Sequence, residues 1–389
     1  MAIRPATSVR FSEDVIREAV KVFGDEAQGT LQSLAEPVHT YYVRCNILKI
    51  FPDQLISLLR MKGLEINQLE ALPEAIGIGV KGPFDISPTK SRVIVDKKTA
   101  ESVLQGANVY APGIMNCESM RRGDLVTIIS EIGEIVAVGD ARMNATEVLT
   151  FKKGLAISVT RRRFLSPQIR ELDEFSKGFL YPQSMAAMVT ARVLDPKPDE
   201  TIVDMNCAPG GKLSHMSQLM RNQGRILGFD RNSRKLSQTR DTVTKLGCKN
   251  VVLAIHDSRY LPDDFPDLKS DRVLIDPPCS ALGLRPKAFD YTKKERIEHL
   301  AAYQKQFVKA ASQIVRHGGI VVYSVCTFTH EECEKVVEFA IQDCELKLVE
   351  QNPRIGGPGL DTFPKASLCQ RFHPYKHEIG YFIAKFVRD

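Results

Sequence analysis

Two cysteines could carry chemistry because each directly follows an apolar run that is typical of a buried strand. Residues 276–280 read Asp-Pro-Pro-Cys-Ser, and residues 323–327 read Tyr-Ser-Val-Cys-Thr. In an open parallel sheet the carboxyl ends of the strands form the ligand crevice, so we expect Cys279, Cys326 and the Asp276 carboxylate to meet there. A thiol beside a carboxylate suits covalent attack on an electron-poor ring that the acid holds. A buried structural thiol is the commoner fate of a single cysteine, but the pair favours a functional site.

A second candidate site is a glycine-bearing turn after the strand predicted at 201–204. Residues 204–212 read Asp-Met-Asn-Cys-Ala-Pro-Gly-Gly-Lys. Glycines at a strand-to-helix turn let a ligand approach the backbone and the N–H groups at the helix start. The spacing matches neither G-x-G-x-x-G nor a Walker motif, so nucleotide phosphates are not the expected ligand. The residues of this turn that we predict to bind a ligand are Asn206, Cys207, Ala208, Pro209, Gly210, Gly211 and Lys212.

Acidic residues follow the next two predicted strands. Asp230 comes about twenty residues after the glycines, where a carboxylate can accept hydrogen bonds from ribose hydroxyls. Asp257 follows the third strand, near the expected position of an adenine edge. With the glycine turn, these acids fit S-adenosylmethionine, and Lys235 and Asp276 complete the predicted cofactor site. Acids after strands are often helix caps, and for Asp230 a cap on the helix starting near Asn232 is compatible with cofactor binding.

The order of predicted elements divides the chain into three parts. Residues 1–90 carry helical and strand patterns of a small α/β unit. Residues 91–164 contain short β-rich runs between turn glycines, which is typical of a small barrel. Residues 165–389 alternate strands with helices, the longest at about 293–315, which predicts a doubly wound sheet. We expect residues 165–195 to pack with the N-terminal unit.

Composition restricts the class of protein. The chain has 389 residues, 43% of them apolar and 26% charged, as in a soluble globular protein of two or three domains. Nine cysteines without a C-x-x-C pair and eight scattered histidines predict a cytoplasmic protein with neither disulfides nor a metal site. The first residues lack the apolar core of a secretion signal, and no apolar run reaches membrane-spanning length. A net charge of +6 permits a polyanionic partner.

In combination, these motifs resemble the Sun-domain (NSUN) family of RNA cytosine-5 methyltransferases. The resemblance covers about 165–389 and extends to 1–88, and residues 91–164 resemble a PUA domain, an RNA-binding pseudo-barrel. The inserted PUA domain is similar to the branch of the sixth human family member, which methylates cytosine 72 at the acceptor end of tRNA. The chain departs from the family pattern at four positions, Asn206, Cys207, Leu213 and Val325.

The resemblance implies a fold and a mechanism. The fold is α/β: a class I doubly wound, Rossmann-like methyltransferase domain with a small RRM-like N-terminal unit and an inserted PUA pseudo-barrel. Cys326 is then the nucleophile that adds to cytosine, Cys279 helps to release the product, and Asp276 holds N3 and N4 of the base. Lys212 orients the base or lowers the pKa of a thiol. The implied cofactor is S-adenosylmethionine. The implied partner is tRNA, bound at its acceptor stem and CCA end. The resemblance further implies a monomeric enzyme that does not associate with a membrane.

Other readings of the same residues are less favoured. A DNA cytosine-5 methyltransferase also uses a Pro-Cys loop, with Cys279 as the nucleophile, but the second cysteine and the PUA-like insert argue against it. An adenine-N6 methyltransferase would carry an aromatic residue at position 279. From a different class, an RNA-binding assembly factor without activity is disfavoured because Asp276, Cys279, Cys326 and Lys212 are all present.

Overall fold

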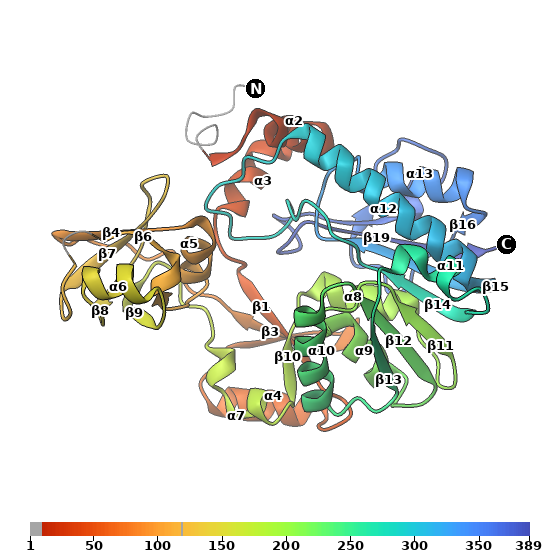
Figure 1. Cartoon of the computed structure of the whole chain (residues 1–389), viewed down its shortest axis with the longest axis horizontal. Coiled ribbons are helices and arrows are strands. Elements are labelled where there is room, and N and C mark those ends of the chain that lie inside the picture. The colour runs from red at the N-terminus through yellow and green to blue at the C-terminus, as the bar shows by residue number, and fades with distance from the viewer. Residues whose placement is uncertain (1–9, 118–119) are drawn as a thin grey trace. The chain divides into compact units, whose positions relative to one another are not determined.

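The computed structural model describes residues 10–117 and 120–389. Residues 1–9, where the predicted N-terminal unit begins, and residues 118–119, inside the PUA-like segment, lie outside the described residues. The chain forms two compact units built from separate segments (Figure 1). Unit 1 holds the chain up to Tyr41, Gly79–Gln168 and Leu284–Tyr291, and unit 2 holds Tyr42–Ile78, Ile169–Gly283 and Thr292–Asp389. Across the described ranges, we find no helix that is both long and apolar enough to span a membrane.

A nine-stranded sheet at the centre of unit 2 confirms the predicted doubly wound fold. Its parallel strands, in spatial order, are β13 (Val251–Ile255), β12 (Arg225–Asp230), β11 (Thr201–Asp204), β14 (Ser270–Ile275) and β15 (Val315–Val325). The chain order reverses between β11 and β14, which is the switch point where doubly wound sheets bind ligands. The remaining strands are antiparallel to their neighbours: β16 (Leu346–Leu348), β17 (Gly357–Pro358), β18 (Gln370–Phe372) and β19 (Tyr381–Arg388).

The central strands are apolar on both faces because helices cover them. Val273, Leu274 and Ile275 of β14 are all fully buried, which is a continuous apolar run and not an alternating one. Helix α12 packs on β14 and β15 and against α13, while α8 packs against α9 (Figure 1). The helices of this domain are α8 (Met185–Leu194), α9 (Gly211–Leu219), α10 (Ser233–Leu246), α11 (Leu261–Asp264), α12 (Lys294–Ile314) and α13 (Glu334–Asp343).

A second, four-stranded sheet in unit 2 braces helix α9. Its strands, in spatial order, are β10 (Leu180–Pro182), β1 (Thr40–Cys45), β3 (Leu72–Gly79) and β2 (Ile66–Leu69), accompanied by α4 (Pro52–Met61) and α7 (Asp173–Ser176). The buried Arg44 on β1 donates to the Gly211 carbonyl at 2.6 Å and to Ser214 Oγ at 2.7 Å. Strand β10 follows the PUA-like segment in sequence, yet it pairs with β1 of the N-terminal part.

A buried ion pair ties the same two layers together. Glu74 on β3 accepts two hydrogen bonds from Arg192 of α8, each 2.7 Å long, and lies 3.0 Å from Nε2 of the fully buried His215 on α9. Burial alone raises the pKa of Glu74, but its hydrogen bonds to His215 and Arg192 lower that pKa well below its ordinary value. Burial lowers the pKa of His215 to about 4, so this histidine is neutral near pH 7 and donates its Nε2 proton to Glu74.

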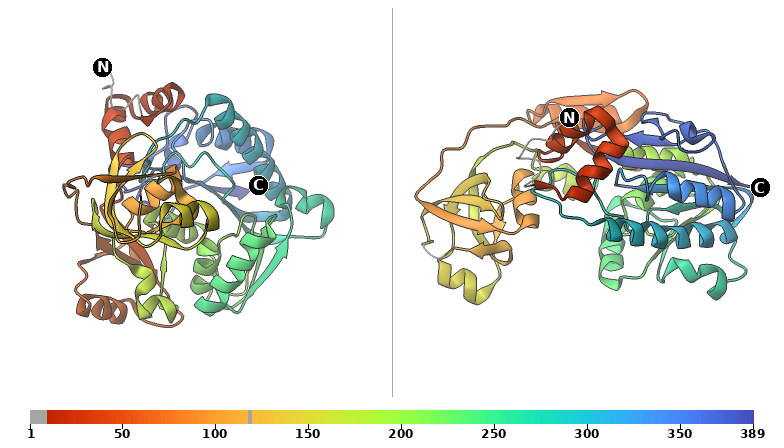
Figure 2. Two further views of the ribbon diagram at one scale, coloured as in Figure 1. Left: turned by 60° about the vertical axis from the view of Figure 1, so that its left-hand side comes forward. Right: turned by 90° about the horizontal axis from the view of Figure 1, so that it is seen from above.

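Unit 1 contains a six-stranded sheet that corresponds to the PUA-like segment (Figure 2). Its strands, in spatial order, are β5 (Val109–Tyr110), β9 (Leu155–Arg162), β8 (Ile135–Ala141), β7 (Leu125–Ser130), β4 (Ser91–Val95) and β6 (Ile114–Asn116), with helices α5 (Lys97–Leu104) and α6 (Ala145–Phe151). Gly139 is required where β8 meets β9, since a Cβ there would lie 2.5 Å from the Ser158 carbonyl. The N-terminal helices α2 (Glu13–Phe23) and α3 (Ala27–Leu34) also belong to this unit.

A short strap, Leu284–Tyr291, lies well inside the methyltransferase sequence and yet belongs to unit 1. The backbone N–H of Lys287 donates to the Leu34 carbonyl at 2.7 Å, and that of Asp290 donates to the Arg10 carbonyl at 2.7 Å. Lys97 Nζ lies 3.3 Å from Asp290 Oδ2. The strap therefore packs with α3 and with helix α5 of the PUA-like segment.

Candidate active site

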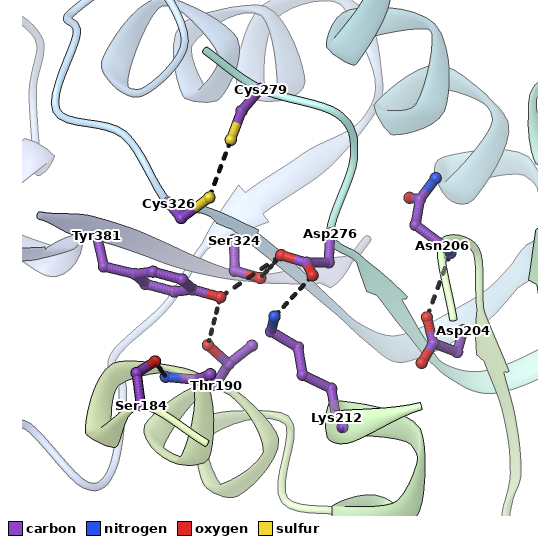
Figure 3. A network of polar contacts seen from close by, with 12 residues as sticks. Ser184, Thr190, Asp204, Asn206, Lys212, Asp276, Cys279, Ser324, Cys326 and Tyr381 are labelled. Carbon is purple, nitrogen blue, oxygen red and sulfur yellow. Dashed lines mark hydrogen bonds and ion pairs between the residues drawn. The ribbon is translucent and has the colours of Figure 1, made fainter. Parts of the chain in front are cut away.

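The two predicted cysteines meet at the carboxyl ends of neighbouring parallel strands. Cys279 lies on the loop after β14 and Cys326 directly follows β15, and the two strands pair with Ile275 opposite Tyr323. The Sγ atoms of the two cysteines are 3.2 Å apart (Figure 3), and both thiols are free. The sheet therefore brings together two groups that are 47 positions apart in sequence.

The hydrogen bond between the two sulfur atoms makes the thiols unequal. It lowers the pKa of Cys326, which burial and Asp276 would raise, and the positive charge of Lys212 lowers it further. The same hydrogen bond, together with burial, raises the pKa of Cys279 well above its ordinary value. Of the two thiols, Cys326 is therefore the one whose surroundings favour the thiolate, and Cys279 the one whose surroundings favour the protonated form.

Asp276 lies beside the thiols and accepts several hydrogen bonds (Figure 3). Its Oδ2 is 2.6 Å from Lys212 Nζ, and its Oδ1 accepts from Ser324 Oγ at 3.1 Å and from the Tyr381 hydroxyl at 3.5 Å. Thr190 Oγ1 in turn donates to the Tyr381 oxygen at 3.4 Å. Three strands and two helices thus fix the orientation of this carboxylate.

The ammonium group of Lys212 is held in its charged form. Burial alone lowers the pKa of Lys212, but Asp276 and Tyr381 raise it well above its ordinary value. The ammonium also lies 5.6 Å from the centre of the Tyr381 ring. Lys212 therefore supplies positive charge next to Cys326 and Asp276 and cannot act as a base near neutral pH.

A cleft of about 350 Å³ lies next to these groups at the switch point. The predicted residues that line it are Asn206, Ala208, Asp230, Lys235, Asp257, Asp276, Cys279 and Cys326. A smaller adjoining cavity of about 180 Å³ is lined by Tyr181 and by the predicted residues Cys207, Pro209, Gly211 and Lys212, and it shares Asn206, Ala208 and Asp276 with the cleft. Gly210 lines neither space.

The two glycines of the turn lie close to neighbouring side chains. Gly210 precedes α9 with a φ of 98°, in the left-handed region that favours glycine. A Cβ on Gly210 would lie 3.2 Å from a Thr239 methyl group, and one on Gly211 would lie 3.2 Å from the Tyr181 ring. The turn thus brings the start of α9, and with it Lys212, close to Asp276.

The two predicted acids differ in how they are engaged. Asp230 Oδ1 accepts from the backbone N–H of Asn232 at 2.8 Å, while the Asn232 side chain caps α10 by accepting from Lys235 N at 3.0 Å. The cap of α10 is therefore Asn232 and not Asp230. Both oxygens of Asp257 accept from the Arg259 guanidinium, at 2.9 and 2.7 Å, which holds the pKa of Asp257 below its ordinary value.

The residues present fit S-adenosylmethionine. Asn206 Oδ1 is buried and has no hydrogen-bond partner within the described ranges, so it is available to a ligand donor. The carboxylates of Asp230 and Asp276 favour a cationic sulfonium ligand, and Tyr303 and Phe307 offer apolar surface for a purine. In the part of the chain that the structure describes, no group of three or more His, Cys, Asp or Glu residues could hold a metal ion.

Pattern reasoning from the sequence did not find Tyr381. It reaches Asp276 because β19 lies antiparallel beside β15, with Phe382 opposite Val325. A strand run at 381–386 was recognisable, but its position in the sheet carries no local sequence signal. Ser324 lies within the motif that pointed to Cys326, although its bond to Asp276 was not predicted.

Comparison with known proteins agrees with this geometry. A family model described as 16S rRNA methyltransferase RsmB/F matches residues 191–387, and a PUA domain model matches residues 91–162. The chain is 42% identical to the tRNA (cytosine(72)-C(5))-methyltransferase of Pyrococcus horikoshii over 96% of this chain and 97% of that protein. It is 27% identical to the human tRNA (cytosine(72)-C(5))-methyltransferase NSUN6 over 92% and 90% of the two chains.

A solved structure shows the same likeness in three dimensions. The crystal structure of NSun6 from Pyrococcus horikoshii with SFG, an S-adenosylmethionine analogue, has a TM-score of 0.91 and 41% identity. The superposition covers 98% of this chain and 99% of that chain. The paired thiols, the Asp276 carboxylate and the two matching domain models lead to one conclusion: this chain belongs to the RsmB/F (Sun) family of RNA methyltransferases and carries a PUA domain.

Proposed function

We propose that this enzyme methylates C5 of cytosine 72 in the acceptor stem of tRNA, with S-adenosylmethionine as the methyl donor and Cys326 as the nucleophile. The observation that carries the proposal is the pair of free thiols, 3.2 Å apart, beside the Asp276 carboxylate. The names of the relatives from Pyrococcus horikoshii and human support the choice of tRNA and of position 72.

The reaction needs a nucleophile because C5 of cytosine is itself a poor one. The Cys326 thiolate adds to C6, which makes C5 electron-rich, while Asp276 holds N3 and N4 of the base. S-adenosylmethionine supplies a methyl group on a positively charged sulfur, which the electron-rich C5 can accept. Loss of the C5 proton then re-forms the C5–C6 double bond and returns the bonding electrons to the Cys326 sulfur as a thiolate.

The pKa difference between the thiols gives Cys279 a role in that last step. In the free enzyme, the hydrogen bond to Cys326 is the largest cause that raises the pKa of Cys279. Once Cys326 is bonded to C6, it carries no negative charge and no longer attracts the Cys279 proton. The pKa of Cys279 therefore falls when the adduct forms, so Cys279 can lose its proton to solvent and then, as the thiolate, take the proton from C5.

RNA recognition is assigned to the PUA domain. Recognition of RNA favours unpaired ends, and a base inside a stem must be flipped out before C5 can react. We infer that residues 91–162 bind the CCA end, next to position 72. The four-stranded sheet with α4 is proposed as the RRM-like unit. The enzyme is further proposed to act as a monomer in the cytoplasm.

Methyl transfer tests the proposal directly. Incubation with tRNA and labelled S-adenosylmethionine should transfer label, and bisulfite sequencing should place it at cytosine 72. Cys326→Ala should abolish transfer. Label on adenine, or on a cytosine outside the acceptor stem, would contradict the proposed reaction or the proposed position.

A further inference from the structure

A fully buried carboxylate, Glu332, lies behind the two thiols in the loop between β15 and α13. Its Oε1 accepts from the backbone N–H of Ser280 at 2.8 Å and from Gln304 Nε2 at 2.9 Å. Its Oε2 accepts from Ser280 Oγ at 2.5 Å and from Thr329 Oγ1 at 3.0 Å. Four donors converge on two oxygens, which is the bonding pattern of a carboxylate that acts only as an acceptor.

The network joins the residues that flank the thiols. Ser280 follows Cys279, Thr327 follows Cys326, and the hydroxyl oxygens of Ser280 and Thr327 are 2.7 Å apart. On the other side of Cys279, Gln304 Nε2 also donates to the Pro278 carbonyl at 3.0 Å. The backbone is therefore held on both sides of Cys279.

Cys326 is fixed by different means. It directly follows β15, whose last residues pair with β19, and its carbonyl accepts from Gly283 N at 3.1 Å. None of these backbone contacts includes Glu332. Removal of the Glu332 carboxylate should therefore displace Cys279 more than Cys326, which the pairing of β15 with β19 still holds.

A buried carboxylate costs free energy unless its hydrogen bonds are complete, and an apolar side chain could fill the same volume. Its four bonds instead fix one short loop beside a reacting group. We propose that Glu332 is a positioning residue that holds Cys279 at its working distance from Cys326 and so controls breakdown of the covalent RNA adduct. The inference rests on the function proposed above, in which Cys279 acts after the attack by Cys326.

The test separates adduct formation from adduct release. Glu332→Met keeps the volume but removes all four acceptor bonds. With RNA that contains 5-fluorocytosine and with S-adenosylmethionine, the rate of covalent capture reports on attack by Cys326. It should fall less than the rate of release, because pairing of β15 with β19 still holds the Cys326 backbone and only the hydrogen bond from Cys279 weakens. With ordinary tRNA, release should slow by about tenfold or more, because small displacements of a reacting group have effects of that size. A protein–RNA adduct should then accumulate on denaturing gels.

Glu334→Met is the matched control. Glu334 is equally buried, but its carboxylate accepts from Arg371 and from the backbone N–H of Leu360, not from the Cys279 loop. This variant should change capture and release by the same factor. Glu332→Gln, which can keep the geometry of the network, should restore release most of the way to wild type.

The outcomes distinguish the inference from the proposed function. If wild-type protein neither methylates tRNA nor forms an adduct, the proposed function is wrong. If wild type is active and Glu332→Met slows capture and release equally, or changes neither, Glu332 has no positioning role. Should Glu332→Met fail to fold, Ser280→Ala decides. This variant removes the hydroxyl that donates to Glu332 and contacts Thr327 Oγ1, and it should slow release several-fold more than capture. Equal slowing of capture and release would overturn the inference.

Discussion

At the scale of single residues, the two sulfur atoms differ only in their surroundings. The hydrogen bond between the two sulfur atoms and the nearby Lys212 ammonium lower the pKa of Cys326, while that hydrogen bond and burial raise the pKa of Cys279. A thiolate is the nucleophilic form of cysteine. The directions of the two pKa shifts therefore support the proposed roles, attack by Cys326 and proton transfer by Cys279.

Substitution of each cysteine should give opposite phenotypes. Cys326→Ala should abolish both methyl transfer and capture of 5-fluorocytosine RNA, because no thiolate remains to attack C6. Cys279→Ala should capture RNA and build up an adduct with ordinary tRNA, because release is slowed. Denaturing gels measure both. Adduct formation by Cys326→Ala but not by Cys279→Ala would reverse the two roles.

Asp230 is predicted to bind the ribose hydroxyls of the cofactor, and the structure suggests a control for this test. Asp230→Ala should weaken S-adenosylmethionine binding by roughly 10- to 100-fold, the value of hydrogen bonds to a charged group, with little change in tRNA affinity. Asn232→Ala removes the cap of α10 but leaves the Asp230 carboxylate. If titration calorimetry gives the same affinity for S-adenosylmethionine in Asp230→Ala and wild type, Asp230 does not bind the cofactor and only accepts the turn hydrogen bond from Asn232.

The site residues that could be predicted from the sequence differ from those that could not in whether a local sequence pattern marks them. Cys279, Cys326 and Asp276 follow apolar strand runs, so their meeting could be predicted from strand polarity alone. Tyr381 and Glu332 act on these groups through strand pairing and through a buried loop, and neither is marked by a local pattern. The alternative role of Asp230 as the cap of α10 is wrong, because the side chain of its neighbour Asn232 makes the capping hydrogen bond.

At the scale of elements, helix α9 is positioned both by the turn that precedes it and by contacts with the four-stranded sheet. It begins at the glycine turn and is tied to the four-stranded sheet by Arg44 and by the Glu74–His215 pair. The strands and helices of the sheet could be predicted from periodicity; the predicted helix at about 293–315 is α12, Lys294–Ile314. The sequence predicts that residues 165–195 pack with the N-terminal unit, but it does not predict the pairing of β10 with β1 itself, because a whole domain separates the two strands in sequence.

The buried His215 makes the stability of unit 2 sensitive to acid. Its pKa is about 4 in the folded protein and 6.5 ordinarily, so the unfolded chain binds more protons between these values. Stability should therefore be fully present above pH 6.5 and fall by up to about 3 kcal/mol as the pH drops to 4. Glu74, whose pKa is lowered, acts in the same direction.

Urea unfolding measured at pH 7 and at pH 4.5 tests this pH dependence. His215→Gln keeps a donor for Glu74 but cannot take up a proton, so this variant should lose less stability than wild type over that interval. Equal losses for the two proteins would show that other groups cause the acid sensitivity.

At the scale of the whole molecule, the PUA domain is proposed to set which cytosine reacts. Removal of the CCA end from tRNA should reduce methylation by about tenfold or more, since a lost positioning contact displaces the target base. Changes to the anticodon arm should leave the rate nearly unchanged. Initial rates of methyl transfer on intact, CCA-less and anticodon-altered tRNA measure the effect, and equal rates on the first two would leave the domain as a general RNA clamp.

The arrangement of the chain has a consequence for how its parts can be exchanged. The chain passes between the two units after Tyr41, Ile78, Gln168, Gly283 and Tyr291. A single protease cut at one of these crossings leaves the two units covalently joined through the other four. Recombination between relatives faces a stricter limit: transfer of unit 1 as a complete folded body must include the strap, which begins five residues after Cys279. The PUA-containing unit therefore cannot be transferred as one continuous stretch of sequence, because part of it is encoded directly after the Cys279 loop.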